Sequence, residues 1–484
     1  MSEGPDMACA QRAADLLFVP EEDDERRGAG DRPYREALQA LAGAAVRHCL
    51  LRDDPRALGD VADLDILVEP GDLRLARAEL ERAGFVLKRD RRRRCKWVFV
   101  RYVAGRFYVL DVHARFVQAG IEYMDARCAL ARCGRVGAVP SLGPEDQFLH
   151  LVLHNLLGKS ALQEKHLERL RALRRAGLER ARLEEQARPF GLEFVLESAL
   201  DGLEDLAADA PGWRRLRRRA RRVLLRRPGN RLGAWRHAHG DRLRWRRRSV
   251  VLALLGPDGS GKTTFADALE AELHGSPLGA GRVYMGCWGH DLLPMRQARR
   301  LVPPQVSYTY LLAAACGMPL VLTPQERDVL AREGRRRLAF AALRHALKGL
   351  LFHAALGVEL FYRYWRHVAL SRRSIVIADR WVQDLEFRHG RNRFVHGGWA
   401  RGLLFRLFPT PDGILYLHAP YDLVARRKPQ LDRQQFEAMD RTFRALLGRH
   451  RPLEIRTEAP PAELARAFLA RHWELLVERC NARA

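Results

Sequence analysis

Apolar residues in the first part of the chain repeat with helix and strand periods in alternation. A helical pattern begins at Tyr34, and Leu64-Asp65-Ile66-Leu67-Val68 has the length and composition of a buried strand. These patterns predict a small α/β domain over residues 35–142. Its predicted elements are strands at 48–51, 64–68, 96–102 and 106–113 and a helix at 73–83.

A helical appendage is predicted to follow over residues 143–212. Gly143-Pro144-Glu145-Asp146 has the signals of a helix start, with proline in the first turn and acids near the positive helix end. Helical spacing continues to about residue 207. Residues 1–34 combine acids, glycine and arginine without any period, so we expect this segment to be disordered.

The carboxy-terminal half begins with the apolar run Val250-Val251-Leu252-Ala253-Leu254-Leu255, which leads directly into a glycine-rich loop. Strands alternating with helices predict a mostly parallel sheet, so we expect a second α/β domain over residues 249–484. The later predicted elements are long helices at 325–366, strands at 375–378 and 413–417, and helices to the end.

A basic segment, residues 213–248, separates the two predicted domains. Residues 214–248 contain 16 arginines and one acid, Asp241, so they carry +15 of the net charge of +25. We prefer a solvated linker here, with an anionic membrane surface as the second interpretation and nucleic acid as the third. The apolar residues that share one helix face are Trp213, Leu216, Ala220, Val223 and Leu224.

Cysteine spacing and apolar runs bear on the compartment. The eight cysteines are scattered and form no C-x-x-C pair, which is typical of reduced thiols rather than zinc or redox sites. Residues 21–25 are all acidic where an export signal needs a basic start and an apolar core. The apolar run 311–322 is shorter than the roughly 20 residues that cross a bilayer. We therefore expect a cytoplasmic protein.

The glycine-rich loop carries the clearest chemical motif. It has the G-x-x-x-x-G-K-[ST] spacing, in which backbone N–H groups close around phosphate oxygens at a helix start. We expect Lys262 to reach the β and γ phosphates of ATP and Thr263 to bind Mg²⁺. Asp258 places a carboxylate beside the γ-phosphate, which favours a kinase. The expected ATP-binding residues are Gly256, Pro257, Asp258, Gly259, Ser260, Gly261, Lys262, Thr263 and Thr264.

A second acidic position follows the predicted strand at 375–378. Because the strand ends in Asp379-Arg380, both side chains should lie at the carboxyl edge of the sheet, where ligands gather. Asp379 would hold Mg²⁺ through water, and Arg380 would clamp the acceptor. The alternative is an ion pair at a strand end.

These segments resemble the thymidylate kinase superfamily of nucleoside-monophosphate kinases over about residues 249–484. Gly256 to Thr263 is similar to its phosphate loop, Asp379-Arg380-Trp381 to its Asp-Arg-aromatic motif, and Pro411 to Leu417 to the strand before its lid. Arg426-Arg427-Lys428 through Arg433 resembles the lid itself. The resemblance implies that Arg427 and Arg433 neutralise charge on the transferring phosphoryl group.

The acceptor segments differ from those of thymidylate kinases. Val283 to His290 stands where the family has Arg-Glu-Pro, and the residues after Trp381 lack its nucleobase-contacting pattern. The sequence looks like a divergent thymidylate-kinase-like group linked in bacteria to surface-polysaccharide synthesis, which implies a nucleoside monophosphate or sugar-like acceptor. Asp384 and Arg388 either contact that acceptor or form a salt bridge on a helix surface.

Acidic residues in the amino-terminal domain form a second constellation. Asp63 and Asp65 lie two residues apart in a strand, hence on one face, and Asp111 lies in a later strand. Three such acids can hold two Mg²⁺, an arrangement similar to the nucleotidyltransferase superfamily related to polymerase β, over about residues 36–205. Leu51-Arg52-Asp53-Asp54 replaces that family's glycine motif. An active nucleotidyltransferase, a degenerate binding or scaffolding domain, and simple capping of a strand stay open.

The sequence thus predicts an ATP- and Mg²⁺-dependent P-loop phosphotransferase with a nucleotidyltransferase-like domain before it. Two other functions stay open: a regulatory or scaffold ATP-binding protein of surface-polysaccharide synthesis, and a nucleic-acid end-processing enzyme. The second would need salt-sensitive oligonucleotide binding by the basic segment, and we disfavour it.

Overall fold

The computed structural model describes two compact units of the chain, each treated separately below. The amino-terminal unit contains described residues between 31 and 239 together with 472–482, and the carboxy-terminal unit contains those between 249 and 471 together with 483. The described residues are 31–51, 58, 63–88, 96–136, 139–159, 161–204, 210–239, 249–287, 289–295, 297, 308–317, 324–371, 373–384, 398–427, 433–447 and 452–483.

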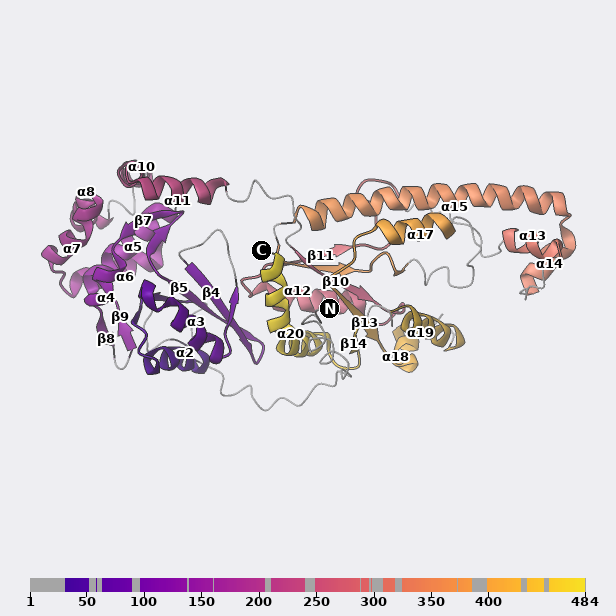
Figure 1. Ribbon diagram of the computed structural model, residues 1–484, viewed down its shortest axis with the longest axis horizontal. Coiled ribbons are helices and arrows are strands. Elements are labelled where there is room, and N and C mark those ends of the chain that lie inside the picture. Colours follow the sequence, from indigo (N-terminus) through magenta and orange to yellow (C-terminus); the bar gives the residue numbers. More distant parts are fainter. Residues whose placement is uncertain are drawn as a thin grey trace, which may run out of the picture. The chain divides into compact units, whose positions relative to one another are not determined.

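The amino-terminal unit is built on a mixed sheet with strand order β3-β4-β5-β2-β1-β9-β8 (Figure 1). β2 and β5 are parallel, whereas β1 and β4 pair with them in antiparallel fashion. β6 and β7 form a separate ribbon. The strands are β1 (His48–Leu50), β2 (Asp63–Val68), β3 (Val86–Lys88), β4 (Lys96–Val103), β5 (Arg106–His113), β6 (Phe116–Gln118), β7 (Ile121–Met124), β8 (Gly134–Val136) and β9 (Val139–Ser141).

Helices cover this sheet and form a second core beside it. Tyr34 of α2 and Leu80 of α3 are buried against Ile66 and Leu110 of the central strands. α5 is buried along most of its length and anchors the helical part of the unit. The helices are α2 (Arg32–Gly43), α3 (Leu73–Arg82), α4 (Ala126–Ala131), α5 (Pro144–Gly158), α6 (Glu164–Arg175), α7 (Arg180–Ala187), α8 (Glu193–Asp201), α10 (Ala210–Leu224) and α11 (Pro228–His239), with short 3₁₀ turns at Pro70–Asp72 and Arg188–Phe190.

The basic segment differs from the solvated linker that the sequence predicted. Trp213, Ala220 and Leu224 of α10 are buried in the same core as α5, so the apolar face of this helix is covered by its own unit. Asn230 of α11 is also buried, and it exchanges two 2.9 Å hydrogen bonds with the backbone of Glu122. Residues 240–248, like residues 1–30 of the predicted disordered segment, lie outside the described residues.

The carboxy-terminal unit has a five-stranded sheet with the order β11-β12-β10-β13-β14. Every pairing is parallel, which confirms the predicted fold class. The strands are β10 (Val250–Leu255), β11 (Ala280–Tyr284), β12 (Ile375–Asp379), β13 (Gly413–His418) and β14 (Leu453–Arg456). The helices are α12 (Lys262–His274), α13 (Tyr308–Ala315), α14 (Pro324–Arg332), α15 (Arg335–Arg363), α17 (Gly398–Leu407), α18 (Tyr421–Arg427), α19 (Arg433–Leu447) and α20 (Pro461–Arg483).

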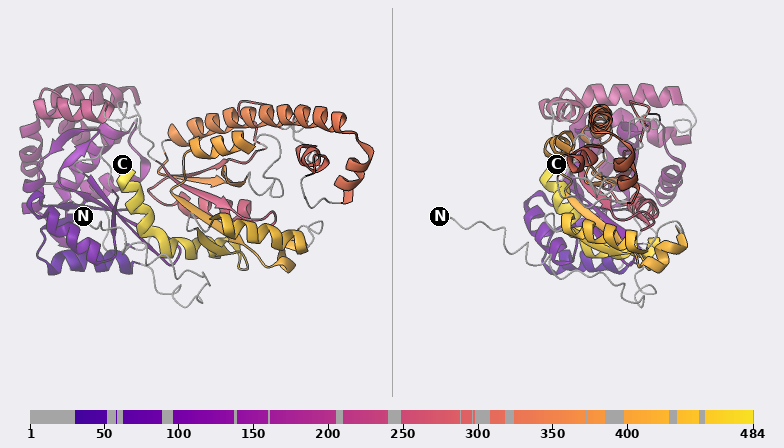
Figure 2. Two further views of the ribbon diagram at one scale, coloured as in Figure 1. Left: turned by 45° about the vertical axis from the view of Figure 1, so that its right-hand side comes forward. Right: turned by 90° about the vertical axis from the view of Figure 1, so that its right-hand side faces the viewer.

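Helices pack on both faces of the parallel sheet, as Figures 1 and 2 show. Val251 and Leu255 of β10 share a core with Phe352 and Leu356 of α15, because alternate strand residues point to one face. α12 packs on the strands and contacts α20 through Phe265 and Phe468. α15 continues into a π-helical turn, Tyr364–Ala369, that leads toward β12. β10 and β12 are parallel neighbours and α12 follows β10, so the carboxyl ends of both strands and the start of α12 lie at one edge of the sheet.

Two details of the predicted layout are wrong. Helices do not run uninterrupted to the end, because β14 adds an edge strand whose four residues contain only two apolar side chains. Residues 472–482 of α20 group with the amino-terminal unit, where the Trp473 ring lies 4.8 Å from that of Phe107.

Among the described residues, no helix has the length and apolar character that a membrane span requires.

Candidate functional site

The loop between β10 and α12 has a backbone that only glycine tolerates well. Gly256, Gly259 and Gly261 have φ angles of 149°, 90° and 86°, a region that disfavours residues with a Cβ atom. A Cβ on Gly256 would also lie 2.2 Å from the carbonyl oxygen of Leu417. These glycines let the loop fold closely over the end of β10 and lead directly into α12. The unpaired N–H groups in the first turn of a helix are suited to binding an anion.

Lys262 lies inside this loop and is only 5% exposed. Its Nζ donates hydrogen bonds to the carbonyl oxygens of Gly256 (2.8 Å) and Pro257 (2.7 Å). Burial, with the nearby Arg380 cation, lowers the pKa of Lys262 to about 8. Ser260 is fully buried, and its hydroxyl has no hydrogen-bond partner among the described residues. A buried cation beside an unsatisfied hydroxyl fits the oxygens of a bound phosphate chain.

Thr263 and Asp379 meet where β10 and β12 end. The Thr263 hydroxyl donates a 3.0 Å hydrogen bond to Oδ2 of Asp379, which is 5% exposed. The register of the parallel pair explains this meeting, because Asp379 lies opposite Leu254 near the end of β10. A hydroxyl beside a carboxylate is a ligand set that suits Mg²⁺, so the residues present fit the ion that the loop motif implies.

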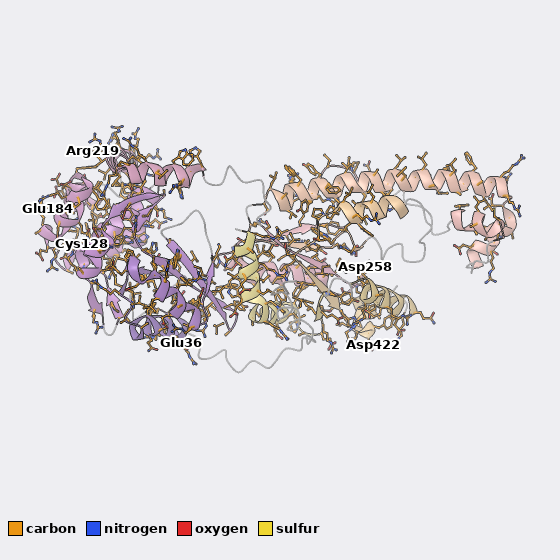
Figure 3. The ribbon with its side chains drawn as sticks, viewed as in Figure 1. Glu36, Cys128, Glu184, Arg219, Asp258 and Asp422 are labelled. Carbon is orange, nitrogen blue, oxygen red and sulfur yellow. The ribbon has the colours of Figure 1, made fainter. Side chains whose placement is uncertain are left out.

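Arg380 connects two carboxylates at the same edge. Its guanidinium donates to both oxygens of Asp384, at 2.9 and 2.7 Å, and to Oδ1 of Asp258 at 2.8 Å. Burial alone would lower the pKa of Arg380, but the Asp384 and Asp258 charges outweigh it and raise that pKa. Its φ of 75° is unfavourable for a residue with a side chain and costs about 1–3 kcal/mol, which the surrounding contacts must offset. Asp258, which is labelled in Figure 3, is the more exposed of the two carboxylates that pair with Arg380.

Asp384 lies in a buried ion pair rather than on the predicted exposed helix surface. Asp384 is 4% exposed and pairs with Arg380, while Arg388 lies outside the described residues.

The predicted lid is described only in part, since residues 428–432 also lie outside the described residues. Arg427 donates a 3.2 Å hydrogen bond to the carbonyl of Gly259 and so contacts the loop. Arg433 instead pairs with Glu437 on its own helix, at 3.2 Å.

A buried ion pair that the sequence did not reveal stabilises the backbone beside this site. Glu359 and Arg363 are 0% and 1% exposed, and their charged groups lie 2.7 Å apart. Arg363 also donates to the carbonyl of Gly286 at 2.8 Å, and its Nη2 has no partner among the described residues. A Cβ on Gly286 would lie 2.7 Å from Cδ of Arg380, so this segment borders the Asp258–Arg380 pair. The available sequence signal was the i,i+4 spacing of opposite charges, in which Glu359 is the one acid of the helix.

A cavity of about 490 Å³ opens along the end of β11, next to this segment. His367 of the π-helical turn lies 2.5 Å from Asp291 at its wall. Such a turn shifts side chains around a helix, and π turns are frequent at functional sites. The lining residues are Arg282, Val283, Tyr284, Gly289, His290, Asp291 and His367.

In the amino-terminal unit, the structure brings Asp65 and Asp111 together. They lie opposite each other in the β2–β5 pair, and their ligand atoms and one from His113 all lie within 4.8 Å of one another. His113 contacts Asp65 at 2.9 Å, and Lys96 forms ion pairs with both acids. Among the described residues, this group does not include Asp63, although the sequence predicted it as a third acidic ligand. The alternation Asp111-Val112-His113 in a strand was the signal that could have identified His113.

Comparison with known proteins gives one family match and several similar solved structures. Residues 43–228 match a family described as uncharacterised nucleotidyltransferase. None of the curated proteins matches the chain. Among solved structures, a thymidylate kinase from Ehrlichia chaffeensis is similar at 16% identity and a TM-score of 0.28, over 47% of this chain and 98% of its own. One from Candida albicans is similar at 16% identity and a TM-score of 0.30, over 49% and 93%.

The family match and the loop geometry bear on different parts of the chain. The first covers residues 43–228 of the amino-terminal unit, and the second lies wholly within the carboxy-terminal unit. Together they support a nucleotide-related transferase. The amino-terminal resemblance is confirmed, since residues 43–228 form a nucleotidyltransferase-like domain.

Proposed function

We propose that the carboxy-terminal unit is an ATP- and Mg²⁺-dependent phosphotransferase that acts on a nucleotide-like or sugar-like small acceptor. One observation carries the proposal: Lys262, the Thr263–Asp379 pair and the Asp258–Arg380 pair converge at the carboxyl ends of β10 and β12. Each of these groups has a defined role in phosphoryl transfer, and their sequence positions span more than a hundred residues.

The loop side of the site would bind the nucleotide. The N–H groups at the start of α12 and the Lys262 ammonium would stabilise negative charge on the β and γ phosphates, and Arg427 approaches the same loop from α18. Thr263 and Asp379 would hold Mg²⁺, which neutralises charge on the phosphate oxygens when bound. The carbonyl oxygens of Gly256 and Pro257 accept hydrogen bonds from Lys262 Nζ and so hold this side chain inside the loop.

Asp258 and Arg380 would act on the acceptor. During transfer, the bond between the γ phosphorus and the β–γ bridging oxygen breaks while an acceptor oxygen bonds to that phosphorus. Where the acceptor is a hydroxyl, its proton leaves toward Asp258, whose carboxylate Arg380 fixes in place. Asp384 holds the guanidinium through both oxygens, so Arg380 keeps its orientation when an acceptor anion binds.

The 490 Å³ cavity beside this edge supports the acceptor class. Arg282, His290 and His367 offer donors, and Asp291 offers an acceptor for hydroxyl groups. A mixed set of this kind suits a polyhydroxylated molecule, with or without a phosphate, better than an apolar one.

A turnover screen tests the proposal. Purified full-length protein is incubated with ATP, Mg²⁺ and a panel of nucleoside monophosphates and sugars, and ADP formation is measured for wild type, Lys262→Ala and the exposed-site control Lys159→Ala. We expect acceptor-dependent turnover that only Lys262→Ala abolishes. Equal inactivity of all three proteins, with no ATP binding, would refute the proposal. ADP and free phosphate without a phosphorylated product would favour the regulatory ATP-binding alternative.

The Asp65, Asp111 and His113 cluster favours a second activity, nucleotidyl transfer by residues 43–228. Two carboxylates and an imidazole can bind a divalent ion, which assists attack on an α-phosphate by stabilising charge. Incubation with α-labelled nucleotides tests this, with Asp65→Asn as the inactive variant. Absence of label transfer from every nucleotide, with metal binding retained, would indicate a binding domain instead.

A further inference from the structure

The outward face of α15 is apolar along nearly its whole length. Phe340, Leu343, Leu347 and Leu351 are 51–69% exposed, and Val358, Phe361 and Trp365 continue the series at 39–54%. Their spacing of three, four or seven residues places them on one side of the helix, because 3.6 residues make a turn. Folded domains seldom leave so long a contiguous apolar surface in water, so this face requires a covering partner.

α17 packs beside α15 and extends this surface (Figures 1 and 2). The ring of Phe361 lies 5.2 Å from that of Phe408, which directly follows α17. Leu403 and Leu407 of α17 are 48% and 62% exposed. We call the exposed apolar residues of α15, its π-helical turn and α17 the apolar ridge.

The charges along the apolar ridge have one sign. α15, the π-helical turn and α17 contain a single acid, Glu359, and it is buried in the pair with Arg363. Helical spacing places several cations one turn or less from the apolar side chains, on one flank of the ridge. These cations are Arg337, Arg344, Lys348 and Arg366.

This charge pattern discriminates between occupants. A second copy of the chain docking through the same ridge would bring cation against cation, since the ridge offers no exposed acid for pairing. An anionic lipid surface instead accepts apolar side chains among its acyl chains and places cations at its headgroups. Trp365 and the two phenylalanines suit the boundary between headgroups and acyl chains.

We propose that the apolar ridge docks this protein on an anionic lipid bilayer, lying on its surface with α15 parallel to it. This surface is distinct from the basic segment 213–248, since the apolar residues of α10 are buried in the amino-terminal core. Docking would place the carboxy-terminal unit beside the membrane and is independent of its ATP chemistry.

Vesicle sedimentation of the full chain tests the proposal. Vesicles contain either phosphatidylcholine alone or one part phosphatidylglycerol to two parts phosphatidylcholine. We expect binding to the anionic vesicles that weakens as salt rises, because screening shortens the reach of surface charge. Leu347→Glu/Leu351→Glu should reduce the partition coefficient by about ten-fold or more. The matched control Leu75→Glu/Leu232→Glu, at exposed positions on α3 and α11, should bind like wild type.

A second variant, Arg344→Gln/Lys348→Gln, keeps every apolar contact and should weaken binding to the anionic vesicles only. Unchanged melting temperatures identify folded variants. The proposal would be overturned if wild type bound neither vesicle type. It would also be overturned if Leu347→Glu/Leu351→Glu bound the anionic vesicles as tightly as wild type. So would a wild-type dimer in light scattering that becomes a monomer in Leu347→Glu/Leu351→Glu, because a second copy would then cover the ridge.

Discussion

Replacing Glu359 by glutamine tests how the loop after β11 is held. One carboxylate oxygen of Glu359 accepts hydrogen bonds from the N–H of Asp291 (2.7 Å) and from Arg363 (2.7 Å). The other accepts from the N–H groups of Leu292 (3.0 Å) and Leu293 (2.7 Å). All four of these groups are donors and they contact both oxygens, so the amide nitrogen of glutamine faces donors in either orientation.

The expected cost is large because this side chain is fully buried. Glu359→Gln leaves Arg363 as an uncompensated buried cation, which costs about 3–5 kcal/mol of unfolding free energy. For a unit of this size, that loss lowers the melting temperature by roughly 10 °C. Glu437→Gln is the control, because its pair with Arg433 is exposed and should contribute less than about 0.5 kcal/mol.

The pH dependence of the same group has a definite sign. Burial would raise the pKa of Glu359, but the three N–H donors and Arg363 outweigh it and hold that pKa below 4.5. The stabilisation is therefore present above about pH 4.5 and is lost as pH falls through the lower folded pKa. As pH is lowered through this acid range, the melting temperature of wild type, measured by calorimetry, should fall more steeply than that of Glu359→Gln. A Glu359→Gln melting temperature equal to that of Glu437→Gln would show that the buried carboxylate does not stabilise the loop after β11.

Three further changes have expected outcomes. Gly256→Ala should abolish ATP binding measured by calorimetry, because its Cβ would lie 2.2 Å from the Leu417 carbonyl oxygen. Asp111→Asn should weaken Mn²⁺ binding to the amino-terminal cluster by roughly ten-fold or more in a calorimetric binding isotherm, since it removes a charged ligand. Asp440 accepts hydrogen bonds from His418, Tyr416 and Arg444, and these outweigh burial and hold the Asp440 pKa well below 3.8. Asp440→Asn should therefore cost roughly 2 kcal/mol in urea unfolding at neutral pH and flatten the loss of stability below pH 3.8.

Each change has a matched control. Gly334→Ala adds a Cβ where no atom lies within 4 Å, so ATP binding should persist. Glu122→Gln removes an acid outside the metal-capable cluster and should leave Mn²⁺ affinity unchanged. Asp422→Asn alters an exposed acid on α18. Any control that behaves like its partner variant would contradict the corresponding explanation.

Local signals explain which elements the sequence predicts. The run from Val250 to Leu255 and the glycines after it are contiguous, so β10, its loop and the start of α12 follow without knowledge of the fold. β12 and β13 are also apolar runs, and both lie within one residue of their predicted bounds. β14 was missed because an edge strand of four residues has too little apolar pattern to stand out.

Contacts between distant segments explain what the sequence could not provide. The Asp258–Arg380 pair joins residues 122 positions apart, and it depends on the order of strands in the sheet. Arg363 likewise binds backbone carbonyls 77 and 79 positions away. The burial of Trp213 was missed for a related reason, since an amphipathic basic helix looks the same whether its apolar face meets lipid or a core.

The fate of the terminal phosphate of ATP shows whether the carboxy-terminal unit is a phosphotransferase. Full-length protein is incubated with γ-labelled ATP, Mg²⁺ and the acceptor panel, and the labelled products are separated. We expect label in a phosphorylated small molecule, and no such product with Lys262→Ala or Asp379→Asn. Label found only in inorganic phosphate, or retained entirely in ATP while the protein binds the nucleotide, would contradict it.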